Sequence, residues 1–380
     1  MRLKIISAVL FLSFSLFQTA HAQRYMEAYS LHREAMDKGD IALGTLYARQ
    51  AWELAKEEIG DTSRTAILAY NYAYLVYWGA PLLSFDPLKD VIRILGPRPE
   101  QFGDQDPELM LAVAEANAGK TPKLYRALTS LVRARQREKQ EPSLLWARAW
   151  NTLMMARVRG EISGDAERAS LQAIETYEQV QPEDYREFAL ALTNAAGIRI
   201  RGAFRKLTDI VRAFEYTDAA IRLFPAQTSI ENFDPLLGEA LAMHTITRST
   251  VYAYVGELDL RNDRRDLARR ISFGGTSLVK WAPDARATPP CSFQWTNQQK
   301  PVFPRAREAD FRFGGIIVGF NLNDEFKAEN VTLVGSVGDS NRTFSNAALK
   351  AVRNWAANRD DALAPVCRRN FLASFAFTFD

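Results

Sequence analysis

The stretch FRFGGIIVGFNL, residues 311–322, alternates large apolar side chains with small or polar ones. A period of two is typical of a β-strand with one buried face. The larger apolar side chains on one side of this strand are those of Ile316, Val318, Phe320 and Leu322. The earlier residues, 24–281, indicate helices almost throughout, so a second kind of structure begins here.

Three further elements complete the C-terminal part. Residues 331–337 and 371–378 also alternate, and residues 343–359 have apolar side chains at helical spacing. The order strand, strand, helix, strand predicts a three-stranded antiparallel sheet with the helix on one face. That face carries the aromatic side chains of the last strand, among them Phe375 and Phe377, and we expect the opposite face to be wetter.

Residues 24–281 predict a series of amphipathic helices. In the segment 40–60, apolar side chains recur three and four residues apart, Gly60 ends the helix, and Asp61 or Thr62 caps the next one. Further helices are predicted at 106–118, 122–138, 142–158, 164–180, 184–202, 204–223, 235–256 and 260–273.

Helical pairs of about 34–42 residues with a glycine before the second helix resemble the tetratricopeptide repeat (TPR). The closest stretch is GDTSRTAILAYNYAYLVYWG, residues 60–79, which is similar to the longer repeats of the kinesin-light-chain type. The resemblance implies a TPR-like α-solenoid with one curved face open to a second partner. An unrelated solenoid or an irregular helical bundle remains an alternative.

The same stretch carries a dense group of aromatic side chains. We interpret four of them as candidates for a peptide-binding groove of the helical array: Tyr70, Tyr74, Tyr77 and Trp78. Tight packing between neighbouring helical hairpins is the alternative interpretation.

Composition changes near residue 283, where PDARATPPCSFQWTNQQKPVFP has a proline about every four residues. We therefore predict an α+β multidomain chain. Its parts are a signal peptide (1–22), a TPR-like helical repeat domain (24–281), a Pro-rich linker (282–300) and a small ββαβ domain (301–380).

The last domain resembles a known family. Residues 301–315, PVFPRAREADFRFGG, are similar to the motif P-x-Y-P-x-x-A followed by glycine, through Pro301, Phe303, Pro304, Ala306 and Gly315. Similarity continues in the strands and helix at Val318, Phe320, Val331, Ser336, Phe344, Ala347, Ala348, Ala351 and Trp355. Over residues 301–379 the chain thus resembles the C-terminal domain of TonB-type energy transducers.

This resemblance implies that the domain binds an extended peptide of an outer-membrane or other envelope protein. The peptide would pair with the free edge of the last strand, where main-chain hydrogen bonds give affinity and side-chain pockets give selection. The edge residues are Phe371, Leu372, Ala373, Ser374, Phe375, Ala376, Phe377 and Thr378. Alternatively, the protein's own helices or the second subunit of a homodimer cover this edge.

Two departures from the family bear on function. The hairpin glycine is replaced by Asp324-Glu325-Phe326, and the long Pro-rich spacer of the transducers is reduced to the short predicted linker. These departures favour peptide binding without energy transduction. A membrane-anchored transducer that supports outer-membrane transport is the alternative.

The N-terminus has the form of a secretory signal. Arg2 and Lys4 precede a short apolar run, and Ala20-His21-Ala22 is a small-residue cleavage sequence. The run is shorter than the about 20 residues that span a bilayer. We predict cleavage before Gln23 and export to the periplasm; an uncleaved inner-membrane anchor is the alternative, and only then would the protein contact a membrane.

Two cysteines, Cys291 and Cys367, fit an oxidising compartment, and we predict a disulfide between them. Two unpaired buried thiols are the alternative. The formal net charge of +3 includes Arg2 and Lys4, so the mature chain is nearly neutral and lacks the charge expected of a nucleic-acid-binding protein.

The sequence does not indicate an enzyme. After the signal segment only His32 and His244 remain, in separate predicted helices, which disfavours a histidine-based triad or metal cluster. We predict that His244 is a core residue and that the protein needs no cofactor or metal. A cell-wall hydrolase with paired carboxylates is a further alternative.

Overall fold

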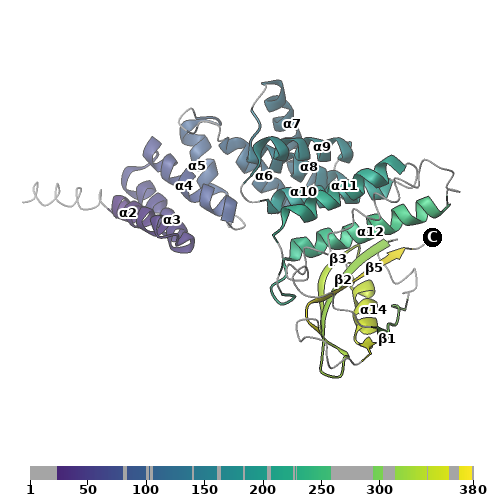
Figure 1. Ribbon diagram of the computed structural model, residues 1–380. Helices are drawn as coiled ribbons and strands as arrows, with labels where there is room; N and C mark the ends of the chain where they lie inside the picture. Colours follow the sequence, from purple (N-terminus) through teal and green to yellow (C-terminus); the bar gives the residue numbers. More distant parts are fainter. Residues whose placement is uncertain are drawn as a thin grey trace, which may run out of the picture. The chain divides into compact units, whose positions relative to one another are not determined.

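The computed structural model describes residues 24–79, 84–99, 102, 106–138, 141–160, 164–182, 185–202, 207–225, 227, 229–257, 294–302, 313–339, 341–358 and 368–378. These residues are mostly helical, with a small sheet near the C-terminus (Figure 1). The chain divides into two compact units, Met1–Gly164 and Asp165–Asp380.

The first unit consists of helices that pack against their neighbours in sequence. Their bounds are α2 (Arg24–Asp37), α3 (Ile41–Ile59), α4 (Ser63–Gly79), α5 (Asp86–Leu95), α6 (Pro107–Gly119), α7 (Pro122–Arg137) and α8 (Leu144–Val158). Small side chains where the helices meet, such as Ala51 and Ala55, are fully buried. Nearest-neighbour packing is the general property of a helical-repeat array.

Side chains typical of helix caps begin several helices. The carboxylate of Asp106, for example, accepts a hydrogen bond from the backbone N–H of Leu109 at 2.9 Å. The other capping residues of this kind are Asp40, Thr121, Ser143 and Asp165. Local sequence therefore determines where these helices begin.

In its described residues, the second unit contains four helices that precede the sheet and a fifth within the C-terminal part. The first four are α9 (Ala166–Val180), α10 (Arg186–Gly202), α11 (Leu207–Leu223) and α12 (Pro235–Glu257). The later elements are β1 (Trp295–Asn297), β2 (Phe313–Leu322), β3 (Ala328–Val337), α14 (Thr343–Val352), β4 (Ala356–Ala357) and β5 (Phe371–Thr378). The main sheet has the order β3-β2-β5 with antiparallel pairing, which confirms the predicted order of strand, strand, helix, strand.

Helix α14 covers the aromatic face of the sheet, as predicted. The ring of Phe344 stacks on Phe377 with centroids 4.8 Å apart, and Phe320 stacks on Phe371 at 5.2 Å. This helix ends at Val352, seven residues before the predicted end at residue 359. It ends there because Trp355 turns back, donates from its indole Nε1 to the carbonyl of Gln299 at 2.8 Å, and leads into β4.

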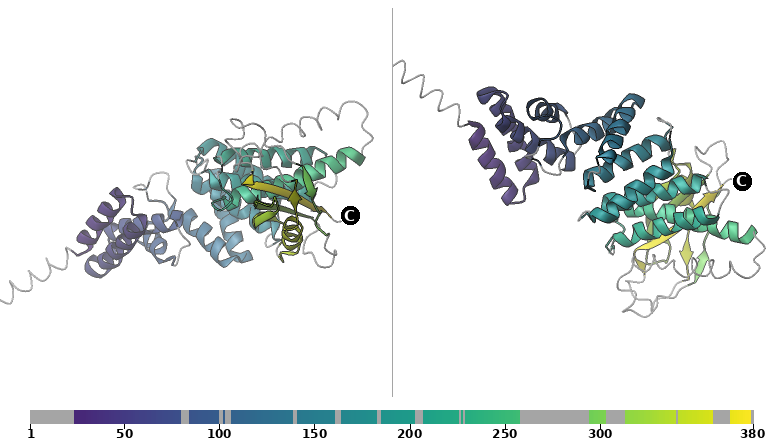
Figure 2. Two further views of the ribbon diagram at one scale, coloured as in Figure 1. Left: turned by 60° about the horizontal axis from the view of Figure 1, so that its bottom comes forward. Right: turned by 90° about the horizontal axis from the view of Figure 1, so that it is seen from above.

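The opposite face of the sheet is covered as well, and the expectation of a wetter face was wrong. Helix α12 lies across it, so the sheet is sandwiched between α12 and α14 (Figure 2). Leu237 and Leu241 of α12 pack with Ile317 of β2, while Val334 and Leu372 join the same core. Small residues on this face permit close approach of the helix: a Cβ added at Gly315 would lie 2.1 Å from the carbonyl oxygen of Ala242.

The predicted linker is only partly within the described residues. Its last part, 294–300, includes β1, which pairs with β4. Trp295 packs edge-on against Trp355 with centroids 5.4 Å apart, so this part belongs to the C-terminal fold. The signal segment 1–22, the predicted helix 260–273, and both Cys291 and Cys367 lie outside the described residues.

Candidate functional site

The predicted edge strand, Phe371 to Thr378, is β5 with those bounds. It lies at one end of the sheet and pairs only with β2 among the described strands. The register is continuous from the pair Phe313–Thr378 to the pair Phe320–Phe371. No strand in the described part of the chain pairs with the outer edge of β5.

The other edge strand, β3, is built differently. Its register with β2 shifts twice, and Asn330 has a positive φ of 51°. Lys327 and Glu329 bring charge to its beginning. Bulges and charges of this kind are the features that keep an edge from pairing with another chain. Strand β5 has no charged residue, no proline and no register shift, so it is the better of the two edges for adding a strand.

Both faces of β5 are held by packing. On the α14 face, Ala373 and Phe377 are buried, and the ring of Phe375 lies 5.9 Å from that of Trp355. On the α12 face, Leu372 joins the core, whereas Ser374 is exposed. The strand is therefore fixed in an extended conformation while the α12 layer is open to solvent near Ser374.

A cavity of about 50 Å³ lies between α12 and β5 at this opening. It is lined by Leu241, His244, Thr245, Arg248, Ile317, Leu372 and Ser374. It reaches β2 and β5 but not β3, so it lies on the β5 side of the sheet. The space is adjacent to the strand that the sequence analysis identified.

His244 is the most buried polar side chain of this cavity, with an exposed fraction of 5%. Its Nδ1 lies 3.1 Å from the hydroxyl of Thr217 on α11, and its ring packs against Phe214 with centroids 4.6 Å apart. Burial lowers the pKa of His244 to about 4, with Asp218 opposing this effect and Arg248 adding to it. The imidazole is thus neutral near pH 7, as expected for the predicted core histidine.

A larger polar groove of about 540 Å³ lies at the beginning of β5. Its walls come from the turn before α12, the β2–β3 hairpin and residues 368–370. Asn370 fixes the approach to β5: its N–H donates to the side chain of Asn321 at 2.8 Å, and its side-chain oxygen accepts from the N–H of Ile230 at 3.3 Å. The guanidinium of Arg368 pairs with Asp324 at 2.7 Å.

The aromatic residues that the sequence suggests for a groove in the helical array differ in how deeply they are buried. Tyr70 is buried and stacks on Phe102 with centroids 4.1 Å apart, and burial raises the pKa of its hydroxyl. Tyr74 has an exposed fraction of 38%. Tyr77 lies under the guanidinium of Arg148 at 5.0 Å. The side chain of Trp78 lies outside the described residues. Tyr70 thus belongs to the core, and Tyr74 is on the surface.

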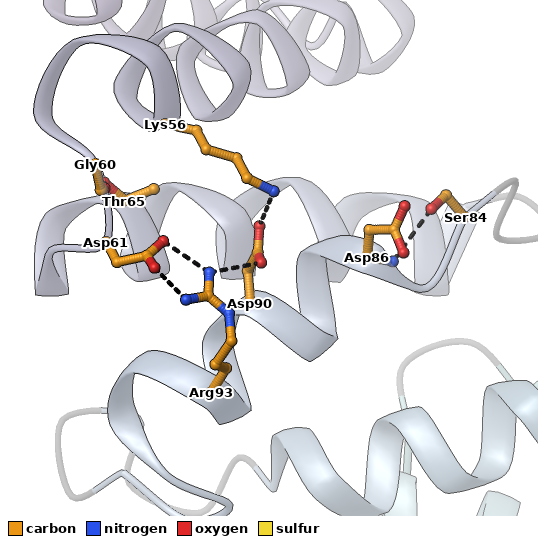
Figure 3. A network of polar contacts seen from close by, with 8 residues as sticks. All are labelled: Lys56, Gly60, Asp61, Thr65, Ser84, Asp86, Asp90 and Arg93. Carbon is orange, nitrogen blue, oxygen red and sulfur yellow. Dashed lines mark hydrogen bonds and ion pairs between the residues drawn. The ribbon is translucent and has the colours of Figure 1, made fainter.

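A cluster of charged side chains joins α3, the turn between α3 and α4, and α5 (Figure 3). The carboxylate of Asp90 accepts from Lys56 at 2.8 Å and from Arg93 at 2.9 Å, and Arg93 also donates to Asp61 at 2.7 Å. Burial alone would raise the pKa of Asp90, but the hydrogen bonds from Lys56 and Arg93 outweigh it and lower the pKa. Both carboxylates are occupied by cations, so the cluster joins helices and offers no free acid or base.

Within the described residues, no group of three or more His, Cys, Asp and Glu side chains is arranged to hold a metal ion. His32 belongs to the first unit, where its Nδ1–H donates to the carbonyl of Gly44 at 2.9 Å, while His244 belongs to the second. Among the described helices, none combines the length and apolarity needed to cross a bilayer.

The sequence predicts both β5 and a helix at 235–256, but not that this helix, α12, lies against the sheet beside the strand. Nothing in the local pattern around His244 indicates contact with residues 130 positions later, because periodicity reports only on the element's own faces. No model of a known protein family matches this chain, and no curated protein matches it.

Proposed function

We propose that this protein is an exported, non-catalytic binding protein of the bacterial envelope. It binds an extended segment of an outer-membrane or other envelope protein by adding that segment as a fourth strand beside β5. The C-terminal domain acts in the manner of a TonB C-terminal domain, and the helical array that precedes it is TPR-like. No cofactor or metal takes part.

The observation that supports this proposal most is the contrast between the two edges of the sheet. Strand β5 has an unbroken register with β2 and no charged residue, whereas β3 is bulged and charged. Each backbone group that pairs with an added strand exchanges a hydrogen bond to water for one to protein, and the peptide gains affinity from the whole row.

The packing of β5 further favours binding. An edge strand that is already held between α12 and α14 loses little conformational freedom when a peptide pairs with it. Binding loses free energy when side chains and backbone segments must become ordered at the interface. An edge strand that is already ordered avoids this loss and therefore binds a peptide more tightly than a mobile strand.

The proposal is tested with the full chain, because removing α12 would expose the apolar side chains of Ile317 and Leu372. Random peptides displayed on phage are selected on the immobilised protein. Consecutive residues of a strand direct their N–H groups to opposite edges, so Ala373 and Ala376, an odd number of positions apart, point in opposite directions. Proline removes the N–H, so Ala373→Pro and Ala376→Pro form a matched pair.

One variant of the pair loses a hydrogen bond to β2, and the other loses only an outward N–H. We expect the second to melt like the wild type and to lose the selected peptides. We also expect bound peptide to slow amide hydrogen exchange in residues 372–376. Peptides that bind the stable proline variant as well as the wild type, or that leave exchange in β5 unchanged, would contradict strand addition.

A further inference from the structure

The cavity between α12 and β5 contains an unusual hydrogen-bonding situation. His244 has an exposed fraction of 5%, and its Nε2 is buried without a hydrogen-bond partner in the described part of the chain. Buried polar atoms are normally paired, and a specific unpaired one requires an explanation. His244 lines the cavity together with Leu372 and the exposed Ser374 of β5, so a group bound in this cavity is the candidate for the missing partner.

The neighbouring hydroxyl groups decide which nitrogen carries the hydrogen. Thr217 donates to the carbonyl of Phe214 at 2.9 Å, and Thr247 donates to the carbonyl of His244 at 2.8 Å. With its own hydrogen committed, the Thr217 oxygen accepts from Nδ1–H of His244 at 3.1 Å. The neutral imidazole therefore presents Nε2 as an acceptor, and the missing partner is a donor.

We propose that this cavity is a side-chain pocket that selects serine or threonine at one position of the added peptide, whose hydroxyl donates to Nε2 of His244. The inference rests on the proposed function, since the pocket receives its side chain from a strand paired with β5. Leu372, Ser374 and Ala376 are the β5 residues that face α12, and alternate side chains of a neighbouring strand face the same layer.

Size and charge restrict the occupant. The cavity volume of about 50 Å³ has room for a few water molecules. A short side chain fills a comparable volume, whereas the side chains of leucine and phenylalanine are much larger. Alanine would fit but leave Nε2 unpaired. A carboxylate brings only acceptor oxygens to a nitrogen lone pair, and so does not satisfy it. A short hydroxyl side chain fits the volume and supplies the hydrogen.

The test is a double-mutant cycle on a peptide selected with the full chain. In the peptide, threonine at the selected position is replaced by valine, which keeps the shape and removes the hydroxyl. In the protein, His244→Asn places an amide near Nδ1 and removes the outer acceptor, while His244→Gln restores an acceptor near Nε2. Ser374→Val, at an exposed position, narrows the mouth of the cavity without touching the core.

We expect threonine to bind the wild type about tenfold more tightly than valine, as for a buried hydrogen bond with one partner removed. The preference should vanish in His244→Asn, return in part in His244→Gln, and shrink in Ser374→Val. Equal affinities of the two peptides for the wild type would overturn the pocket and mean that the cavity holds only water. If peptides still bind through the edge of β5 in that case, the proposed function stands without the pocket. If no selected peptide depends on the edge of β5, both the pocket and the proposed function are contradicted.

Discussion

Gly238 of α12 and Gly335 of β3 meet backbone to backbone. A Cβ added at Gly238 would lie 2.1 Å from the carbonyl oxygen of Val334, and one added at Gly335 would lie 2.1 Å from the carbonyl carbon of Gly238. Real Cβ atoms do not approach backbone this closely, so the helix lies on the sheet at a separation that only glycine permits. This pair fixes the position of α12 above β2, β3 and β5.

Alanine at Gly238 should therefore destabilise the second unit. In an ordinary helix the change from glycine to alanine stabilises by about 1 kcal/mol, but here overpacking should outweigh it and cost about 1–3 kcal/mol. Urea unfolding of the full chain measures the effect. Gly197→Ala on α10 is the control, since an added Cβ there meets only the flexible end of Met243. Equal stability of the two variants would contradict the close contact.

His244 should make stability depend on pH. Its pKa is about 4 in the folded protein, against 6.5 for the free group, because of burial. Between these values the unfolded chain binds the additional proton, so stability falls as pH falls below about 6.5 and the loss levels off below about 4. Between about pH 7.5 and pH 4.5 the His244 contribution is about 2–3 kcal/mol.

Carboxylates titrate in the same range, so this contribution is measured as a difference. The loss of unfolding free energy between the two pH values is compared for the wild type and His244→Asn. We expect the variant to lose less by about 2 kcal/mol. Identical losses in the two proteins would mean that His244 is not neutral and buried.

The buried ion pair of the first unit should be worth more than an exposed one. Arg135 donates to Asp106 at 2.7 Å, and their side chains have exposed fractions of 7% and 2%. Asp106→Ala leaves the guanidinium without this partner and removes the cap of α6, so we expect a loss of about 3–5 kcal/mol.

Arg98 and Glu138 provide the matched comparison. They form a pair at 2.6 Å with both side chains 46% exposed. Because water screens such a pair, Arg98→Ala should change stability by about 0–1 kcal/mol. Thermal unfolding of both variants tests the ranking, and a larger loss for Arg98→Ala would reverse it.

The proposed export predicts that the mature protein begins at Gln23. Mass spectrometry of the protein purified from its native host, after cell fractionation, measures both the first residue and the compartment. A chain that retains Met1 and sediments with the inner membrane would favour the anchored alternative.

The C-terminal sheet could be predicted largely because its strands carry their own pattern. The alternation in FLASFAFT gave β5 its bounds, and the aromatic side chains identified the face beneath α14. Helix starts were also predictable, since capping residues such as Asp106 act on the first turn alone. These are local signals, and they carry over to the structure.

Helix α5 was missed although its signals are present. Pro87 occupies its first turn and Gly96 follows its last residue, which is the typical placement of both. Its ten residues lie between further prolines at 81, 97 and 99, and this surrounding composition resembles a loop. A short helix with proline on both sides is therefore easily mistaken for part of a loop.

The contact between α12 and the sheet had no local signal. The opposite face was expected to be wetter because only one helix was predicted to cover the sheet. Glycines such as Gly315 and Gly335 allow a second helix to approach that face closely. For the same reason, His244 could be recognised as buried but not as part of a cavity beside β5. Contacts between distant segments require knowledge of which faces meet, and one sequence does not supply it.

The unbroken register between β2 and β5 has a mechanical consequence. Eight residue pairs follow one another without a shift, so a pull directed along the strand loads their hydrogen bonds simultaneously, while a pull across it ruptures them one after another. A peptide paired with the outer edge of β5 in the same unbroken way would resist a force applied along the strand axis. A force applied perpendicular to the strand would separate it residue by residue.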